Sequence, residues 1–113
     1  TLSAHFGLAH GMANACVLPY VTAFNSEAVP EAMTELARAV GLETGNDIEK
    51  DRLLLSDALL ALTKKIKTLS EQGIERKDFD MLAEDVLKEP VLGFNPRQGV
   101  TKQDIIAILE QAY

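Results

Sequence analysis

Cysteine, aromatic residues and strand-forming patterns are scarce in this chain of 113 residues. Cys16 is the only cysteine, so the chain forms no internal disulfide and offers no cysteine cluster for zinc. Aromatic residues make up 5% of the sequence, and no stretch alternates apolar and polar residues over the length of a strand. The sequence therefore predicts an all-α protein.

Long apolar runs are absent as well. No run reaches the length of about 18 apolar residues that a membrane span requires. The first residues, "TLSAHFGLAHG", lack the basic and continuously hydrophobic parts of a signal peptide. We therefore expect a cytoplasmic protein that does not associate with membranes.

Positive charge is also in deficit. Asp and Glu number 17 against 11 Lys and Arg, which gives a formal net charge of −6. Such a chain repels DNA unless one face is locally basic. The one candidate, Lys64, Lys65 and Lys67, falls near the end of an expected helix, where cations are favourable without any ligand. We expect no nucleic-acid partner.

The apolar residues that are present, which belong to a 47% hydrophobic composition, recur with helical spacing. This length and composition fit one domain over residues 1–113. We expect a bundle of about five main helices, with Pro19 bending the first. The expected helices cover residues 12–24, 30–40, 47–72, 78–89 and 101–113.

The expected helix ends carry recognisable stop and start residues. Gly41 and Gly73 supply left-handed stops for the second and third helices. Thr101 and Asp104 form a capping box at the start of the last one. Further N-terminal caps are expected from Asn46 or Asp47 and from Asp78.

The stretch "EPVLGFNPRQG" at residues 89–99 has no helical period. One hypothesis treats it as a connector, with Phe94 folded onto the bundle and Arg97 capping the carboxyl end of a helix. The other hypothesis places it beside a ligand, since long loops often carry function. The residues alone leave the two equally open.

Few side chains carry obvious chemistry. Cys16 lies six positions from His10 and on a different helix face, so it is better explained as a buried small residue than as a nucleophile. His5 and His10 would be separated by roughly 140° around a helix, which opposes binding of one ion by both. No serine-hydrolase elbow, glycine-rich phosphate loop or H-E-x-x-H zinc motif is present. On these grounds His10 is either a structural histidine or a ligand.

Two groups of residues carry a resemblance. The pairs His10-Gly11, Asn14-Ala15, Leu18-Pro19 and Phe24-Asn25 follow one another in that order, and "GFNPR" at residues 93–97 precedes the Thr-capped terminal helix. Together they resemble the second signature region and the chain end of the iron-dependent (group III) alcohol dehydrogenases. The resemblance extends along the whole sequence, and it implies the all-helical C-terminal domain of a dehydroquinate synthase-like architecture.

Members of that family interconvert alcohols and aldehydes with NAD or NADP. They use Fe²⁺, or Zn²⁺ in sister enzymes, held by one aspartate and three histidines, and the metal acts as a Lewis acid. The resemblance implies that His10 is the last of those histidines, with Gly11 allowing a tight backbone turn. Ala9 stands where the family commonly has proline, and His5 matches no ligand position.

The remaining ligands, a further active-site histidine and the N-terminal nucleotide-binding domain would all precede Thr1. We therefore assign no catalytic residue within these 113 residues. We expect the chain by itself to be inactive and to hold neither iron nor nicotinamide tightly. The resemblance also suggests Val91 and Phe94 as apolar walls of a substrate pocket.

The expected partners are the N-terminal domain, a small alcohol or aldehyde and, because a lone half-enzyme exposes apolar surface, further copies of the protein. Two alternatives remain. One is a helical protein-interaction module in which His10 is structural. The other is a domain of a zinc-dependent polyol dehydrogenase or a lyase related to dehydroquinate synthase. "NPR" at residues 95–97 favours the alcohol dehydrogenases.

Overall fold

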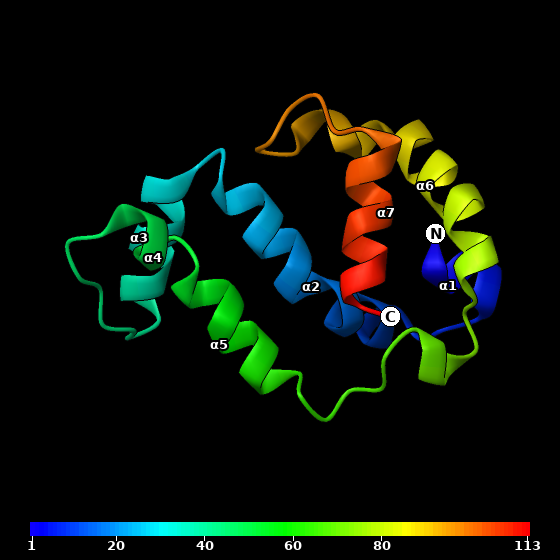
Figure 1. Cartoon of the computed structure of the whole chain (residues 1–113), viewed down its shortest axis with the longest axis horizontal. Coiled ribbons are helices and arrows are strands. Elements are labelled where there is room, and N and C mark those ends of the chain that lie inside the picture. The colour runs from blue at the N-terminus through cyan, green and yellow to red at the C-terminus, as the bar shows by residue number, and fades with distance from the viewer.

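The computed structural model describes residues 1–113 and contains only helices, turns and loops (Figure 1), which confirms the predicted all-α class. It lacks any helix that combines the length and apolar character of a membrane span. The α-helices are α1 (Leu2–Phe6), α2 (His10–Ser26), α3 (Pro30–Ala39), α4 (Ile48–Asp51), α5 (Leu54–Leu62), α6 (Phe79–Lys88) and α7 (Lys102–Gln111). Three 3₁₀ helices lie at Ser70–Gln72, Arg76–Asp78 and Pro90–Phe94.

Helix α2 is the longest element, with 17 residues, and it runs between the two halves of the molecule (Figure 1). Its contacts reach α5 on one side and α7 on the other. Pro19 lies inside α2 without ending it, and its side chain is buried. The molecule measures 42 × 32 × 19 Å, and its shortest dimension corresponds to about two helix diameters.

The apolar core lies in the half formed by α6, α7 and the segment that precedes them. Leu69, Ile74 and Leu82 are almost completely buried there. The ring of Phe79 packs edge-on against Tyr113, with ring centroids 5.7 Å apart. The cluster also contains Cys16, Ala83, Ile105, Leu109 and Ala112.

The third predicted helix is wrong in its extent. Of residues 47–72, only 48–62 form α4, a turn and α5, which ends at Leu62. Beyond that point the chain turns so that Leu69 enters the core, where its N–H donates to the carbonyl of Ala112 at 3.0 Å. Burial in a distant core therefore outweighs the local helical period, and Gly73 ends only the 3₁₀ helix Ser70–Gln72.

Of the predicted N-terminal helix caps, some are confirmed and one is wrong. Thr101 and Asp104 form the predicted capping box of α7, and Asp47 accepts from the N–H of Glu49 at 3.1 Å at the start of α4. The side chain of Asp78 does not cap α6. Its carboxylate instead accepts from the N–H of Glu75 and forms the capping box at the start of the preceding 3₁₀ helix. The sequence does not predict helix α1, since five residues are too few to show a period.

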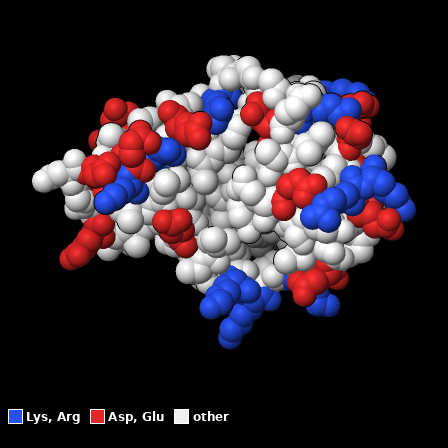
Figure 2. All heavy atoms as spheres, in the orientation of Figure 1, with Lys and Arg blue, Asp and Glu red and all other residues white.

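The lysine cluster of residues 64–67 follows directly after α5, as predicted for cations at the end of a helix. These lysines are exposed. Figure 2 shows basic side chains gathered at the lower edge of the molecule, where this segment lies, while acidic side chains are spread over both ends.

Candidate metal and substrate cleft

A cleft of about 300 Å³ lies between α2, α6, α7 and the chain start. One face of α2 lines it, because residues 10, 14, 17, 21 and 25 recur at helical spacing. The opposite wall comes from apolar residues of α6 and α7, including Leu82, Val86 and Ile108. The sequence analysis did not identify any of these residues as cleft walls. For α2 the helical spacing of residues 10, 14, 17, 21 and 25 could have shown that they share one face.

His10 is the first residue of α2 and lines the end of this cleft with an exposed side chain. Gly11 is helical and does not form the predicted tight turn. The left-handed residue is Gly7, with φ of 65°, which ends α1. A Cβ at Gly11 would meet nothing within 4 Å, so the helix surface at Gly11 is open.

Ala9 precedes α2 with φ of −56° and ψ of 135°. This φ lies within the range that proline imposes on its own backbone. Alanine at this position, where the resembling family commonly has proline, therefore leaves the approach to His10 in a geometry that proline would also adopt.

His5 belongs to a different arrangement. Its Nε2 lies 2.6 Å from a carboxylate oxygen of Asp85 on α6. Lys88 binds the other oxygen of Asp85 at 3.0 Å. The hydrogen bonds from Lys88 and then from His5 lower the pKa of Asp85 below its usual value. His5 thus ties α1 to α6 and is already paired away from His10.

No group of three His, Cys, Asp or Glu side chains in the structure could hold a metal ion. The exposed imidazole of His10 fits one nitrogen ligand of a divalent iron or zinc ion, since neutral imidazole is a ligand that both metals accept. One donor does not make a stable site. Within residues 1–113, His10 is therefore the one residue that we assign as a ligand of such an ion.

Cys16 is buried in the core, as predicted. Its Sγ donates to the carbonyl of Lys67 at 3.3 Å and accepts from Nε2 of Gln72 at 2.8 Å. These bonds join α2 to the segment that follows α5. The thiol is thus a small packed group with satisfied polar contacts.

Val91 and Phe94 do not line the cleft that contains His10. Their side chains are 70% and 88% exposed, and they line a neighbouring groove of about 370 Å³. Val86, Leu92 and Asn95 line both the groove and the cleft. The residues of this loop that face the cleft are therefore Leu92 and Asn95, which sequence reasoning did not place there.

The connector hypothesis for residues 89–99 is half right. Phe94 is not folded onto the bundle, because most of its surface is exposed. Arg97 does cap the carboxyl end of a helix: its Nη1 donates to the carbonyl of Phe24 near the end of α2 at 3.3 Å. The same guanidinium lies 4.0 Å from the centre of the Phe24 ring and pairs with Glu27 at 2.7 Å.

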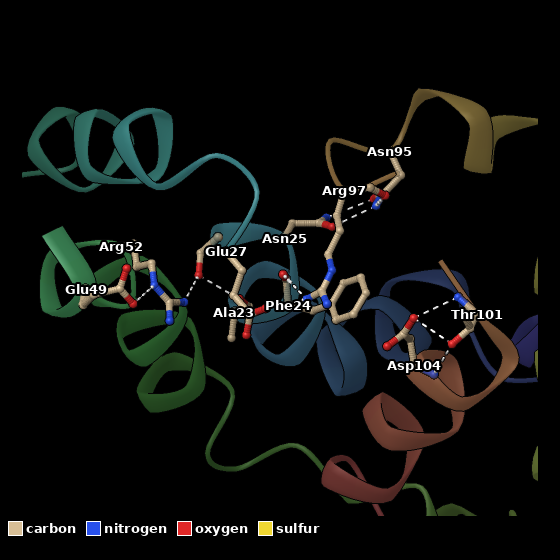
Figure 3. A network of polar contacts seen from close by, with 11 residues as sticks. Ala23, Phe24, Asn25, Glu27, Glu49, Arg52, Asn95, Arg97, Thr101 and Asp104 are labelled. Atoms are coloured by element: carbon tan, nitrogen blue, oxygen red, sulfur yellow. Dashed lines mark hydrogen bonds and ion pairs between the residues drawn. The ribbon is translucent and has the colours of Figure 1, made fainter. Parts of the chain in front are cut away.

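The end of α2 is joined to both halves of the molecule (Figure 3). Asn25 and Asn95 face each other and exchange two side-chain hydrogen bonds of 3.0 and 2.9 Å. On the other side, Nη1 of Arg52 donates to Oγ of Ser26 at 2.7 Å. Two arginines, Arg52 and Arg97, thus lie at the negative end of the α2 dipole.

The structure thus defines an all-α protein in which a His-Gly pair opens a helix that lines an apolar cleft. More specifically, the chain belongs to the Fe-containing alcohol dehydrogenase family, because the model of that family's C-terminal part matches residues 1–113.

Curated relatives agree. The chain is 30% identical over 116 residues to lactaldehyde reductase of Escherichia coli strain K12, covering 99% of this chain and 30% of that protein. It is 35% identical over 119 residues to NADPH-dependent butanol dehydrogenase of Clostridium saccharobutylicum, covering 96% of this chain and 29% of that protein. The chain therefore spans about 30% of the length of these relatives.

A solved structure supports the fold as well. The alcohol dehydrogenase from Oenococcus oeni superposes with a TM-score of 0.89 at 34% identity, covering 99% of this chain and 30% of that one. The helical architecture predicted from the resemblance is thereby confirmed.

Proposed function

We propose that these residues are the C-terminal, substrate-side domain of an NAD(P)-dependent alcohol dehydrogenase that interconverts alcohols and aldehydes, with His10 as one ligand of a divalent iron ion. The observation that carries this proposal is the position of His10. It is exposed at one end of an apolar cleft, beside the open space at Gly11. Membership of the Fe-containing family supports the choice of iron over zinc.

Bound iron would supply a Lewis acid at the substrate oxygen. The residues of this chain would bind that iron and orient the substrate. A ring nitrogen of His10 would occupy one coordination position of that iron, and His10 is the first residue of α2. Val17, Val21 and Ile108 offer apolar walls that bind the carbon chain of the substrate and exclude water.

The remaining parts belong to residues outside this chain. We propose that an N-terminal nucleotide-binding domain supplies the nicotinamide site, the aspartate and the other histidine ligands. We assign no catalytic residue within residues 1–113. The exposed Val91 and Phe94 are proposed as apolar surface that closes on the substrate side once that domain is in place. Exposed apolar side chains such as Leu62 also favour a homo-oligomer.

The coding sequence upstream of Thr1 tests this proposal first. We expect an open frame that contains an aspartate, two histidines and a glycine-rich nucleotide fold. The full-length protein, loaded anaerobically with Fe²⁺, should then reduce propanal with NADH or NADPH. An unrelated upstream domain, or no turnover with either nucleotide, would refute the proposed function.

A further inference from the structure

The loop of residues 89–100 is attached to the rest of the molecule at one place. Every side-chain hydrogen bond that joins it to another element ends at Phe24, Asn25 or Glu27, at the C-terminal end of α2. The two most exposed apolar residues of the loop, Val91 and Phe94, contribute little packing. No residue of the loop is fully buried, although Val100 packs against the apolar core. Polar contacts with α2 therefore contribute to holding this loop.

The amide pair of Asn25 and Asn95 is the centre of that attachment (Figure 3). Asn25 is 8% exposed, and its Nδ2 donates to Oδ1 of Asn95 at 3.0 Å. Nδ2 of Asn95 returns a bond of 2.9 Å to Oδ1 of Asn25 and donates a second one of 2.8 Å to the carbonyl of Arg97. Removing one donor would leave partly buried acceptors without partners, which proteins rarely tolerate.

The amide pair also borders the cleft. Asn25, Asn95 and Leu92 line its wall, and His10 lines its other end. The spacing of 15 residues along α2 places His10 and Asn25 roughly 22 Å apart at 1.5 Å per residue. The cleft therefore has a histidine end and a loop end.

We propose that Asn25 and Asn95 are positioning residues: their amide pair fixes the loop of residues 89–100 as the far wall of the cleft and so sets how well long substrates are accepted. This inference rests on the proposed function, which places the reacting carbon at the histidine end. A short aldehyde held there does not reach the loop. A long aldehyde extends along α2 toward Leu92 and depends on where that wall lies.

Two isosteric variants test the amide pair, and the one that loses more hydrogen bonds is expected to have the larger effect. Asn95→Asp removes both bonds that Nδ2 donates, whereas Asn25→Asp removes only the bond donated to Oδ1 of Asn95. Asn46→Asp is the matched control, because it makes the same change of charge at an exposed position outside the cleft. All three are made in the full-length enzyme.

Hydrogen exchange gives a readout that does not depend on activity. The amides of Leu92 and Asn95 are bonded within the loop, and we expect them to exchange roughly tenfold faster in Asn95→Asp and less so in Asn25→Asp. Peptides from α7 and all peptides of the Asn46→Asp control should be unchanged. Unchanged loop exchange in Asn95→Asp would show that the pair does not hold the loop.

Steady-state reduction of propanal and hexadecanal then separates positioning from mere support of the fold. We expect the ratio of kcat/KM for hexadecanal to kcat/KM for propanal to fall roughly tenfold in Asn95→Asp. Faster loop exchange with an unchanged ratio, or equal losses for both aldehydes, would overturn the inference. A wild-type enzyme that reduces neither aldehyde would instead overturn the proposed function.

Discussion

The two halves of the molecule on either side of α2 are held together by different interactions. The half containing α6 and α7 buries apolar side chains: eight of the nine members of the core cluster fall between Leu69 and Ala112. In the half containing α3, α4 and α5, Ala37 is the only fully buried apolar residue. The buried polar or charged residues, Thr22, Asn25, Ser26, Thr34, Asp51 and Ser56, all come from α2, α3, α4 and α5.

The half containing α3, α4 and α5, here called the polar half, buries few apolar side chains and is held mainly by hydrogen bonds and ion pairs. No buried side-chain nitrogen or oxygen atom lacks a hydrogen-bond partner. Asp51 accepts from the N–H of Gly45 at 2.9 Å, and Arg52 reaches Ser26 on α2. Several large apolar residues of this half are exposed, with Leu62 at 80%. The half containing α6 and α7 therefore supplies most of the hydrophobic stability. The half containing α3, α4 and α5 binds the end of α2 through Arg52, and the loop of residues 89–100 binds the same end through Asn95 and Arg97.

The largest effect should follow from cutting into the apolar half. Leu82 is 1% exposed, so Leu82→Ala leaves a cavity and should lower the free energy of unfolding by about 2–5 kcal/mol. Leu62→Ala removes the same atoms from a largely exposed side chain and should cost less than about 0.5 kcal/mol. Urea unfolding measures both. Equal losses at the two positions would contradict the proposed division.

Breaking the polar half should cost less. Arg52→Met leaves the buried Ser26 hydroxyl without its charged partner and should cost about 1–3 kcal/mol. Hydrogen exchange should accelerate in α4 and α5 and not in α7. Lys50→Met removes an exposed cation from α4, two residues before Arg52, and serves as the control. Faster exchange in both halves would show that they unfold as one unit, and it would contradict the claim that different interactions stabilise them.

The cap of α7 should have a smaller effect, and one that depends on pH. Thr101→Ala removes the side-chain acceptor for the N–H of Asp104 and should cost about 1 kcal/mol at neutral pH. The backbone N–H and then the hydroxyl of Thr101 lower the pKa of Asp104 below its ordinary value of 3.8. Stability from a carboxylate with a lowered folded pKa is present above the unfolded value and is lost as pH falls through the folded one.

The stability difference between the wild type and Thr101→Ala should therefore be constant at neutral pH and shrink below about pH 3.8, the unfolded value. Thermal unfolding as a function of pH measures it. Gln103→Ala, an exposed change in the same first turn of α7, is the control. A difference that grows on acidification would contradict this explanation of the cap.

The smallest effect on stability is expected at the loop surface. Phe94→Ala should change the free energy of unfolding by less than about 0.5 kcal/mol, because the side chain is largely exposed. In the full-length enzyme it should alter the preference between short and bulky alcohols if Phe94 closes on the substrate side. Unchanged kinetics across such a series would remove Phe94 from the proposed pocket.

The sequence predicted what depends on neighbours along the chain. The capping box at Thr101 and the burial of Cys16 follow from local chemistry and residue type, and the structure confirms both. The end of α5 could not be predicted, because Leu69 leaves the helical period to join a core made by residues far along the chain. The helical spacing that begins at His10 outlines the cleft, but the contacts that join Asn25 to Asn95 and Phe24 to Arg97 span 70 and 73 residues of sequence.

The metal content of the full-length protein is the decisive measurement for the role of His10. After anaerobic loading with Fe²⁺ and desalting, elemental analysis should find stoichiometric iron in the wild type and in His5→Ala, whose imidazole pairs with Asp85. His10→Ala should retain far less iron. The iron-free forms of His10→Ala and the wild type should unfold at the same urea concentration, since the side chain of His10 is exposed. Full iron retention in His10→Ala, or its loss in His5→Ala alone, would contradict the assignment of His10 as the ligand.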